Sequence, residues 1–199
     1  MTMKGISDEE VLQQFLKGDE SAFVVIMRRY KDPITTFVYR FLGNYDDAVD
    51  VAQETFVRVY RYGNTFTGDV KFSTWLYTIA GNLARTELRR YRRRFGTSLK
   101  DSFAKGEEET WDIPDETYRP DETVDRTKIV QEVQKALMSV SPTYREVVIL
   151  RDVQQLTYEE IAEVTKTEIG TVKSRINRGR AQLQEKLKGL YNEIFANVS

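Results

Sequence analysis

The chain contains no cysteine and no histidine. Without cysteine it can form no disulfide, no thiolate zinc site and no thiol nucleophile. Without histidine it lacks the side chain that proteins use most often as a general base and as a metal ligand. These absences exclude Ser–His–Asp, Cys–His and zinc-hydrolase chemistry. Carboxylate-bound Mg²⁺ chemistry is the catalytic alternative that remains.

Long apolar runs are also missing, because no stretch of about 18 residues is apolar enough to span a membrane. The amino-terminal segment MTMKGISDEEVLQQ is acidic and amphipathic and has no apolar core of a secretory signal. We therefore expect a cytoplasmic protein with no direct membrane insertion.

Charge is almost balanced over the whole chain, with 30 basic and 31 acidic side chains, but it is unevenly distributed. Residues 85–96 hold six arginines against Glu87, and residues 171–199 hold six basic and two acidic side chains. Between them, residues 97–125 hold ten acidic and three basic side chains. Two local basic segments are sufficient for binding a polyanion, so the near-neutral total does not argue against nucleic acid.

Helical signals dominate on both sides of this acidic segment, and no segment reads as a strand. The segment itself has no sustained hydrophobic period, and two of the four prolines lie in it, so we interpret it as a flexible linker. The sequence predicts an all-α fold of two small helical domains. The predicted ranges are 1–95 for the first domain, 96–126 for the linker and 127–199 for the second domain.

The amino-terminal domain shows five helix starts. Ser7 and Glu10 form a capping box, and Asp32 with Pro33 reads as a cap followed by proline at the first helical position. Ser73 reads as the cap of the last and longest helix. The expected helices cover residues 8–17, 20–31, 33–42, 46–62 and 74–94.

The carboxy-terminal domain contains a helix-turn-helix pattern. Thr157 and Glu160 form another capping box, a three-residue turn is centred on Lys166, and a long helix follows from about Ile169. Small polar and basic side chains on the outer face of that helix could reach base edges and phosphates in a major groove. A solvated surface helix is the ordinary alternative for such a pattern.

Two surfaces of the first domain suggest contacts with other molecules. Asp47, Asp50 and Glu54, with Gln53 beside them, form an outward acidic stripe that could dock on a basic partner. A cluster of aromatic residues then precedes an arginine-rich helix end, as a single-stranded nucleic-acid site requires. The alternatives are a solvated acidic face for the stripe and a buried core for the aromatic residues.

Three segments carry a resemblance to a known family. They are DDAVDVAQETF at 46–56, FSTWLYTIAGN at 72–82 and GTVKSRINRGR at 170–180. In this order and at these spacings, the sequence resembles a bacterial sigma factor of the extracytoplasmic-function (ECF) group, the minimal two-domain kind. The resemblance covers about residues 8–95 and 127–190.

The resemblance implies a regulatory subunit without enzymatic activity, cofactor or metal, which directs RNA polymerase to promoters. It implies that the core polymerase is bound by Asp47, Asp50, Gln53, Glu54 and Phe56. It implies that the melted −10 element is held by Phe66, Phe72, Ser73, Trp75, Asn82, Arg89, Arg90 and Arg93. It implies that the −35 duplex is read by Thr171, Lys173, Ser174, Arg175 and Arg178. The family linker threads the polymerase channels, and an anti-sigma factor is the expected inhibitor.

The sequence departs from the family pattern at two places. Thr86 stands where the family commonly has aspartate, four residues after Asn82. The helix-turn-helix turn usually carries glycine, an apolar residue and proline, whereas this chain has Lys166, Thr167 and Glu168. These differences concern local turn geometry and the fine promoter preferences.

Two other functions compete with this interpretation. A stand-alone helix-turn-helix regulator would bind duplex DNA without polymerase, although such proteins usually dimerise and the sequence shows no dimerisation zipper. A Mg²⁺-dependent nuclease would use the acidic residues Asp46, Asp47, Asp50 and Glu54.

Overall fold

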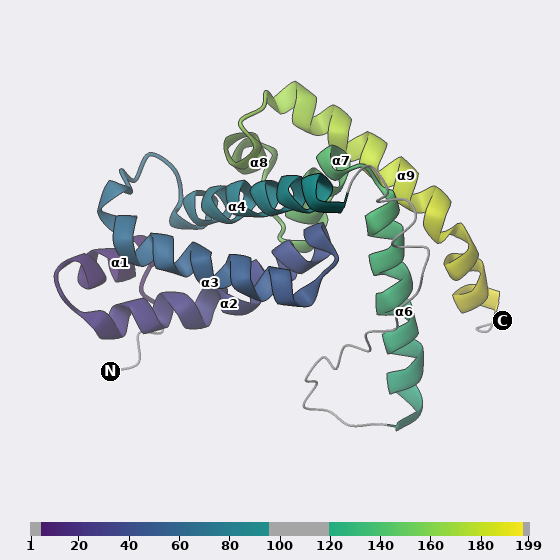
Figure 1. Ribbon diagram of the computed structural model, residues 1–199, viewed down its shortest axis with the longest axis horizontal. Helices are drawn as coiled ribbons and strands as arrows, with labels where there is room; N and C mark the ends of the chain where they lie inside the picture. Colours follow the sequence, from purple (N-terminus) through teal and green to yellow (C-terminus); the bar gives the residue numbers. More distant parts are fainter. Residues whose placement is uncertain (1–4, 96–119, 197–199) are drawn as a thin grey trace.

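The computed structural model describes residues 5–95 and 120–196, and Figure 1 shows their arrangement. Every regular element in these ranges is a helix, which confirms the all-α fold class. None of these helices combines the length and the apolar character needed to cross a bilayer. The predicted linker lies largely outside the described residues, which stop at 95 and resume at 120.

The amino-terminal domain is a bundle in which α2 packs against each of the other long helices. Its elements are α1 (Asp8–Leu16), α2 (Glu20–Leu42), α3 (Tyr45–Tyr62), the short 3₁₀ helix η1 (Gly63–Thr65) and α4 (Phe72–Phe95). The predicted capping box of α1 is present, since the Glu10 amide donates to Ser7 Oγ and the Ser7 amide donates to Glu10 Oε2.

The prediction of two helices between residues 20 and 42 is wrong, because α2 is one continuous helix with Pro33 inside it. Proline removes one backbone hydrogen bond and disfavours a helix interior. On either side of it, however, Ile26, Ile34 and Phe37 are fully buried in the core. Burying one continuous apolar face outweighs the missing bond.

The start of α4 also differs from the prediction, since the helix begins at Phe72 and not after Ser73. A side chain from α1 explains the shift: Glu9 Oε1 accepts a hydrogen bond of 2.8 Å from the Phe72 amide. A carboxylate at this position satisfies an amide that has no partner within the helix and suits the positive end of the helix dipole. Such a cap from a distant helix cannot be read from local sequence.

The carboxy-terminal domain contains α6 (Pro120–Ser139), α7 (Pro142–Val148), the π-helical turn η2 (Ile149–Val153), α8 (Tyr158–Thr165) and α9 (Ile169–Ala196). Helix α6 begins at Pro120, inside the range 96–126 that the sequence predicted as linker. Helix α7 follows the N-cap Ser141 and has Pro142 in its first turn.

The helix-turn-helix is formed by α8 and α9. The predicted capping box of α8 is confirmed by hydrogen bonds between Thr157 and Glu160 in both directions. The turn is made by Lys166, whose backbone is left-handed at φ 51° and ψ 47°. The β-carbon of Lys166 makes this left-handed conformation more costly than it would be for glycine. Beyond the turn, buried Val172 and Ile176 hold α9 against the domain core.

The two domains pack against one another, which the sequence did not predict. Helix α4 lies along α8, and α2 contacts α6, α7 and η2 (Figure 1). One hydrophobic cluster runs through both domains and joins Phe37 and Leu76 of the first to Leu150 and Ile161 of the second. In this conformation the two domains therefore share one hydrophobic core.

Gly179 allows α7 to approach α9 closely. A β-carbon on Gly179 would lie 2.6 Å from Val148 Cγ2 and 3.1 Å from the Tyr144 carbonyl oxygen. We expect Gly179→Ala to lower the free energy of unfolding by about 1–3 kcal/mol, because the helices must move apart. Gly189 is the matched control on the same helix, since nothing lies within 4 Å of its β-carbon position. Gly189→Ala should raise stability by about 0.5–1 kcal/mol. Denaturant unfolding of both variants checks this, and equal effects would contradict the close approach.

Candidate protein and nucleic-acid interfaces

The acidic stripe of α3 is exposed as the sequence predicted. Asp50, Gln53 and Glu54 are exposed, and Glu54 is paired with Arg58 on the next turn at 2.9 Å. Asp47 is half-buried, and desolvation together with the nearby carboxylates of Glu87 and Asp50 raises its pKa. Phe56 lies in the core and is only 6% exposed, so it supports this face from inside and is not part of its surface.

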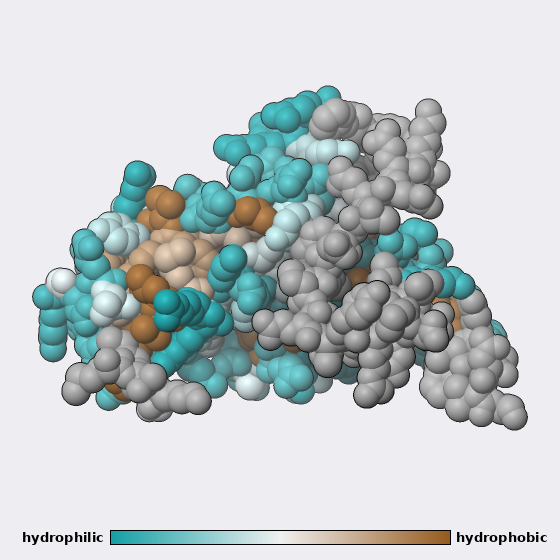
Figure 2. All heavy atoms as spheres, turned by 90° about the horizontal axis from the view of Figure 1, so that it is seen from below, coloured by the Kyte–Doolittle hydropathy of each residue, from teal (hydrophilic) through white to brown (hydrophobic). Residues whose placement is uncertain are grey.

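Apolar side chains continue this surface over the amino-terminal domain. Figure 2 shows apolar side chains gathered on this domain on the face seen from below. The exposed apolar residues of α1, α2 and α3 are Leu16, Val24, Met27, Val57, Tyr60 and Tyr62. The ring of Tyr60 also contacts Phe15 and Phe23 at 5.1 and 5.2 Å between centroids. An apolar patch beside a charged stripe is typical of a protein-binding surface.

Aromatic rings from the loop and from the start of α4 form one cluster. The rings of Phe66, Phe72 and Trp75 lie 5.5 to 5.9 Å apart. Phe72 is fully buried, whereas Phe66, Ser73 and Trp75 are half-buried at the surface. Phe72 therefore belongs to the core, whereas the side chains of Phe66, Ser73 and Trp75 are partly exposed to solvent.

Helix α4 carries a row of polar and basic side chains away from this cluster. The exposed members that the sequence singled out are Asn82, Arg89, Arg90 and Arg93. Arg85 lies between Asn82 and Arg89 and is half-buried. Its Nη2 donates to Asn82 Oδ1 at 2.8 Å. The aromatic cluster offers ring surfaces for stacking at one end of α4, and the row of side chains offers cations along the helix. A single-stranded nucleic-acid site requires both.

The outer face of α9 is open. Lys173, Ser174 and Arg178 are exposed, whereas Thr171 and Arg175 are half-buried. The hydroxyl of Ser174 donates to the Thr171 carbonyl oxygen at 2.9 Å, a contact that leaves its lone pairs available to a base. Arg180 is not available, since its guanidinium holds Asp152 through two contacts of 3.0 and 2.5 Å. The helix therefore presents a short polar and basic face to solvent.

An ion pair between the domains was missed by the sequence reasoning. Arg85 Nη1 of α4 contacts Glu146 Oε1 of α7 in a very short contact, and the Glu146 side chain is only 8% exposed. Burial raises the pKa of Glu146, and the facing Arg85 opposes this shift. No local pattern identifies this pair, because its members are 61 residues apart.

Comparison with known proteins assigns both domains. Residues 26–94 match the family described as Sigma-70 region 2, and residues 130–183 match Sigma-70, region 4. The chain is 35% identical over 179 residues to the ECF RNA polymerase sigma factor SigW of Bacillus subtilis (strain 168). This alignment covers 90% of the chain and 96% of the relative.

The chain belongs to the ECF group of RNA polymerase sigma factors. As a sigma factor, it directs promoter-specific initiation of transcription. The expectation of an ECF sigma factor, made from three short segments, is confirmed.

Solved structures share the fold of this sigma factor. The sigma factor RpoE in complex with the anti-sigma factor NepR, from Bartonella quintana, aligns with a TM-score of 0.65 at 27% identity, over 83% of this chain and 96% of that one. CnrH, in complex with the cytosolic domain of CnrY, aligns with a TM-score of 0.68 at 24% identity, over 92% and 97% of the two chains. The second likeness concerns the fold alone.

The alternative of a Mg²⁺ nuclease finds no support in the described part of this sigma factor. Among residues 5–95 and 120–196, no three acidic side chains converge as they would around a metal ion. On α3, Glu54 is instead engaged by Arg58.

Proposed function

We propose that this sigma factor divides promoter recognition between its two domains. The amino-terminal domain binds core polymerase and holds the melted −10 strand, and the carboxy-terminal domain inserts α9 into the −35 duplex. The observation that carries the proposal is the face of α9, where Lys173, Ser174 and Arg178 are exposed while Val172 and Ile176 anchor the helix. A helix supported in this way is a typical major-groove reader.

Polymerase docking uses the exposed acidic side chains of α3. Asp50, Gln53 and Glu54 make the direct contacts, with Asp47 at the edge and Phe56 holding the helix in place from the core. Val57 and Tyr60 lie about one and two helical turns after Gln53 on the same helix. Both are exposed and add apolar area to the contact. An acidic stripe flanked by apolar side chains would fit a basic, partly apolar surface on the polymerase.

The −10 strand is held at the aromatic cluster and along α4. Phe66 and Trp75 offer half-exposed rings to an extruded base, with Ser73 beside them and Phe72 supporting them from below. Each stacked base contributes about 1–3 kcal/mol, which offsets the lost pairing and stacking in the duplex. Asn82 offers its amide to a base. The backbone follows Arg89, Arg90 and Arg93.

The −35 element is read by Thr171, Lys173, Ser174, Arg175 and Arg178. Arg178 is long enough to reach a guanine edge in two hydrogen bonds, and Lys173 meets phosphate. The Lys173 Nζ lies 5.7 Å from the centre of the Tyr158 ring, a weak cation–π contact that a DNA phosphate could replace.

The factor performs no chemistry of its own and acts where the chromosome is, in the cytoplasm. Because one related sigma factor was solved in complex with an anti-sigma factor, a cognate inhibitor of this kind is the expected regulator of this chain. The acidic segment 97–119, outside the described residues, would thread the basic channels of the polymerase as a polyanion mimic.

Run-off transcription tests the function as a whole. Core polymerase supplemented with the purified chain should initiate at a subset of a genomic promoter library, and the start sites should share two sequence elements. Core polymerase alone is the control. Tight, specific binding of the chain to duplex promoters without polymerase would favour a stand-alone regulator, and absence of initiation would contradict the proposal.

Arg178→Ala tests base reading at the −35 element. The variant should lose about 1–3 kcal/mol of promoter binding and relax sequence preference at one position of the element. Holoenzyme binding to a set of single-base promoter variants measures this. Lys186→Ala, an exposed cation further along α9, should leave the preference unchanged. A uniform loss over all sequences would make Arg178 a phosphate contact.

Asp50→Lys with Glu54→Lys tests polymerase docking. The double charge reversal should weaken binding to core polymerase at least about tenfold, because it places like charges against a basic surface. Both residues are exposed, so the thermal unfolding of the free chain should change little. Glu132→Lys with Glu185→Lys, on α6 and α9, reverses the same charges elsewhere and is the control. Unchanged holoenzyme assembly in the α3 variant would reject the docking site.

A further inference from the structure

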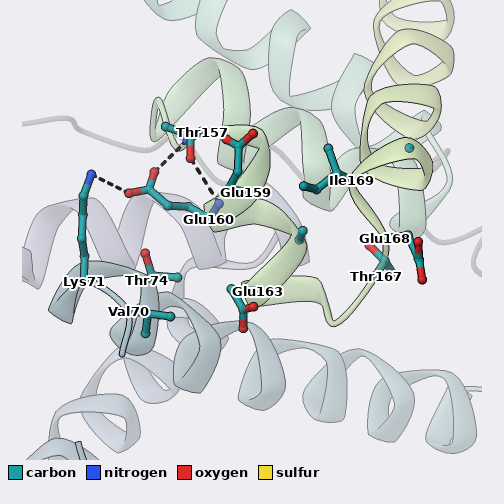
Figure 3. Close-up of a pocket in the computed structure, with 12 residues that line it drawn as sticks. Val70, Lys71, Thr74, Thr157, Glu159, Glu160, Glu163, Thr167, Glu168 and Ile169 are labelled. Carbon is teal, nitrogen blue, oxygen red and sulfur yellow. Dashed lines mark hydrogen bonds and ion pairs between the residues drawn. The ribbon is translucent and has the colours of Figure 1, made fainter. Parts of the chain in front are cut away.

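Polar contacts join the domains along the seam between α4 and the carboxy-terminal domain, and three of them pair two side chains. Arg85 pairs with Glu146, and the hydroxyl of Tyr77 donates to Gln154 Oε1 at 2.5 Å. The third contact is between Lys71 Nζ and Glu160 Oε1 at 2.8 Å. Figure 3 shows Lys71 reaching Glu160 across a groove of about 730 Å³ between the start of α4 and α8.

The first of these contacts occupies the surface that we assign to the −10 strand. Arg85 lies on α4 three residues after Asn82 and four before Arg89, so the three side chains share one face of the helix. Its guanidinium holds Glu146 with one nitrogen and Asn82 with the other. A carboxylate on an arginine of a strand-binding face stands where a DNA phosphate would bind.

The backbone at this point is also shielded. Gly81 is buried, and a β-carbon there would lie 3.3 Å from both Arg85 Nη1 and Glu146 Oε1. Arg175 of α9 is the other charged side chain whose field reaches Glu146. Glu146 thus lies in the electrostatic field of one arginine from each domain.

The closed arrangement cannot span a promoter. Helix α8 packs on α4 on one side and on α9 on the other. Packed helices lie about 8–10 Å apart, so α4 and α9 are separated by about 20 Å. The −35 and −10 elements are named for positions 25 base pairs apart, which is about 85 Å along a duplex that rises about 3.4 Å per base pair. The seam must therefore open before both elements are bound.

The seam has features of a contact built to open. Arg40 Nη1, Arg145 Nε and Gln134 Oε1 are buried without a hydrogen-bond partner on α2, α7 and α6, which also pack together where the two domains meet. Burial lowers the pKa of Arg145 to about 10. Buried polar atoms without partners, and a buried ion pair that must be desolvated, oppose the gain from the apolar surface that the two domains bury together.

Resting on the proposed function, we propose that Glu146 is an internal competitor for promoter DNA: it occupies Arg85, a further strand-binding residue, and locks the free factor closed until polymerase separates the domains. The lock acts on the −10 face, whereas the exposed face of α9 stays free in both arrangements.

The chain has no cysteine, so two cysteines introduced in place of exposed Lys17 and Lys186 report the distance between domains by fluorescence energy transfer. In this labelled background, Glu146→Lys should open the free chain, because it sets a cation against Arg85. Arg85→Glu should open it as well. The double variant Arg85→Glu with Glu146→Lys restores an ion pair of opposite polarity and should close it again. Glu132→Lys, an exposed reversal on α6, should remain closed.

The second readout is binding of the free chain to a single-stranded oligonucleotide, the non-template strand of a promoter that the holoenzyme uses. Glu146→Lys should bind it about tenfold more tightly than the parent chain, since apparent affinity rises with the open fraction. Arg85→Glu should open without gaining affinity, because the strand-binding cation is lost. Glu132→Lys shows how much any added positive charge contributes. Circular dichroism confirms that each variant is folded.

The outcomes separate the lock from the proposed function. Unchanged energy transfer in Glu146→Lys, or failure of the double variant to close, overturns the lock. Opening without a gain in strand affinity overturns its inhibitory role. Run-off transcription with the same variants judges the function independently: Glu146→Lys should initiate normally, since its domains are already apart in the holoenzyme. A chain that initiates nowhere would contradict the proposed function, while energy transfer would still decide the lock.

Discussion

Helix α2 is the element on which the rest of the molecule is built, because both domains bury parts of its surface. Its amino-terminal neighbours are α1, α3 and α4, and α6, α7 and η2 cover it from the other domain. Phe37 and Phe41 stack on α2, and Phe41 also contacts a side chain of the second domain. Tyr77 of α4 meets the Phe37 ring edge-on at 5.6 Å, and Arg145 of α7 lies 5.4 Å from the centre of the Phe41 ring. Burying one helix thus requires both domains.

This shared support sets the positions of the functional surfaces. Covering α2 leaves the acidic face of α3, the aromatic loop and the outer face of α9 on the outside, each on a helix that is anchored from within. It also brings α7 against α4, where Arg85 and Glu146 form an ion pair between the domains. The functional residues are therefore held by packing. The domain contact combines shared apolar packing with buried polar pairs, and a binding partner can replace those pairs with equivalent contacts of its own.

Helix types, caps and the helix-turn-helix could be predicted because they depend on neighbours three or four residues away. Ser7 with Glu10 and Thr157 with Glu160 are of this kind. What the sequence did not predict depends on distant partners. Glu9 caps α4 across 63 residues, and Glu146 meets Arg85 across 61. Pro33 locally favours a helix start and so predicted a break within α2. The buried apolar face on both sides of it keeps the helix continuous. Phe56 and Phe72 were placed in sites by motif, although their burial could be decided only by the assembled bundle.

The left-handed turn at Lys166 has a consequence for how this chain can vary. A residue with a β-carbon at this backbone conformation costs about 1–2 kcal/mol relative to a right-handed one, and glycine or asparagine would relieve it. The lysine side chain is exposed and its pairing with Glu163 is a surface contact, so little opposes such a replacement. Replacing Lys166 by glycine or asparagine should therefore raise the stability of the turn between α8 and α9. Such a change alters none of the side chains to which we assign base contacts.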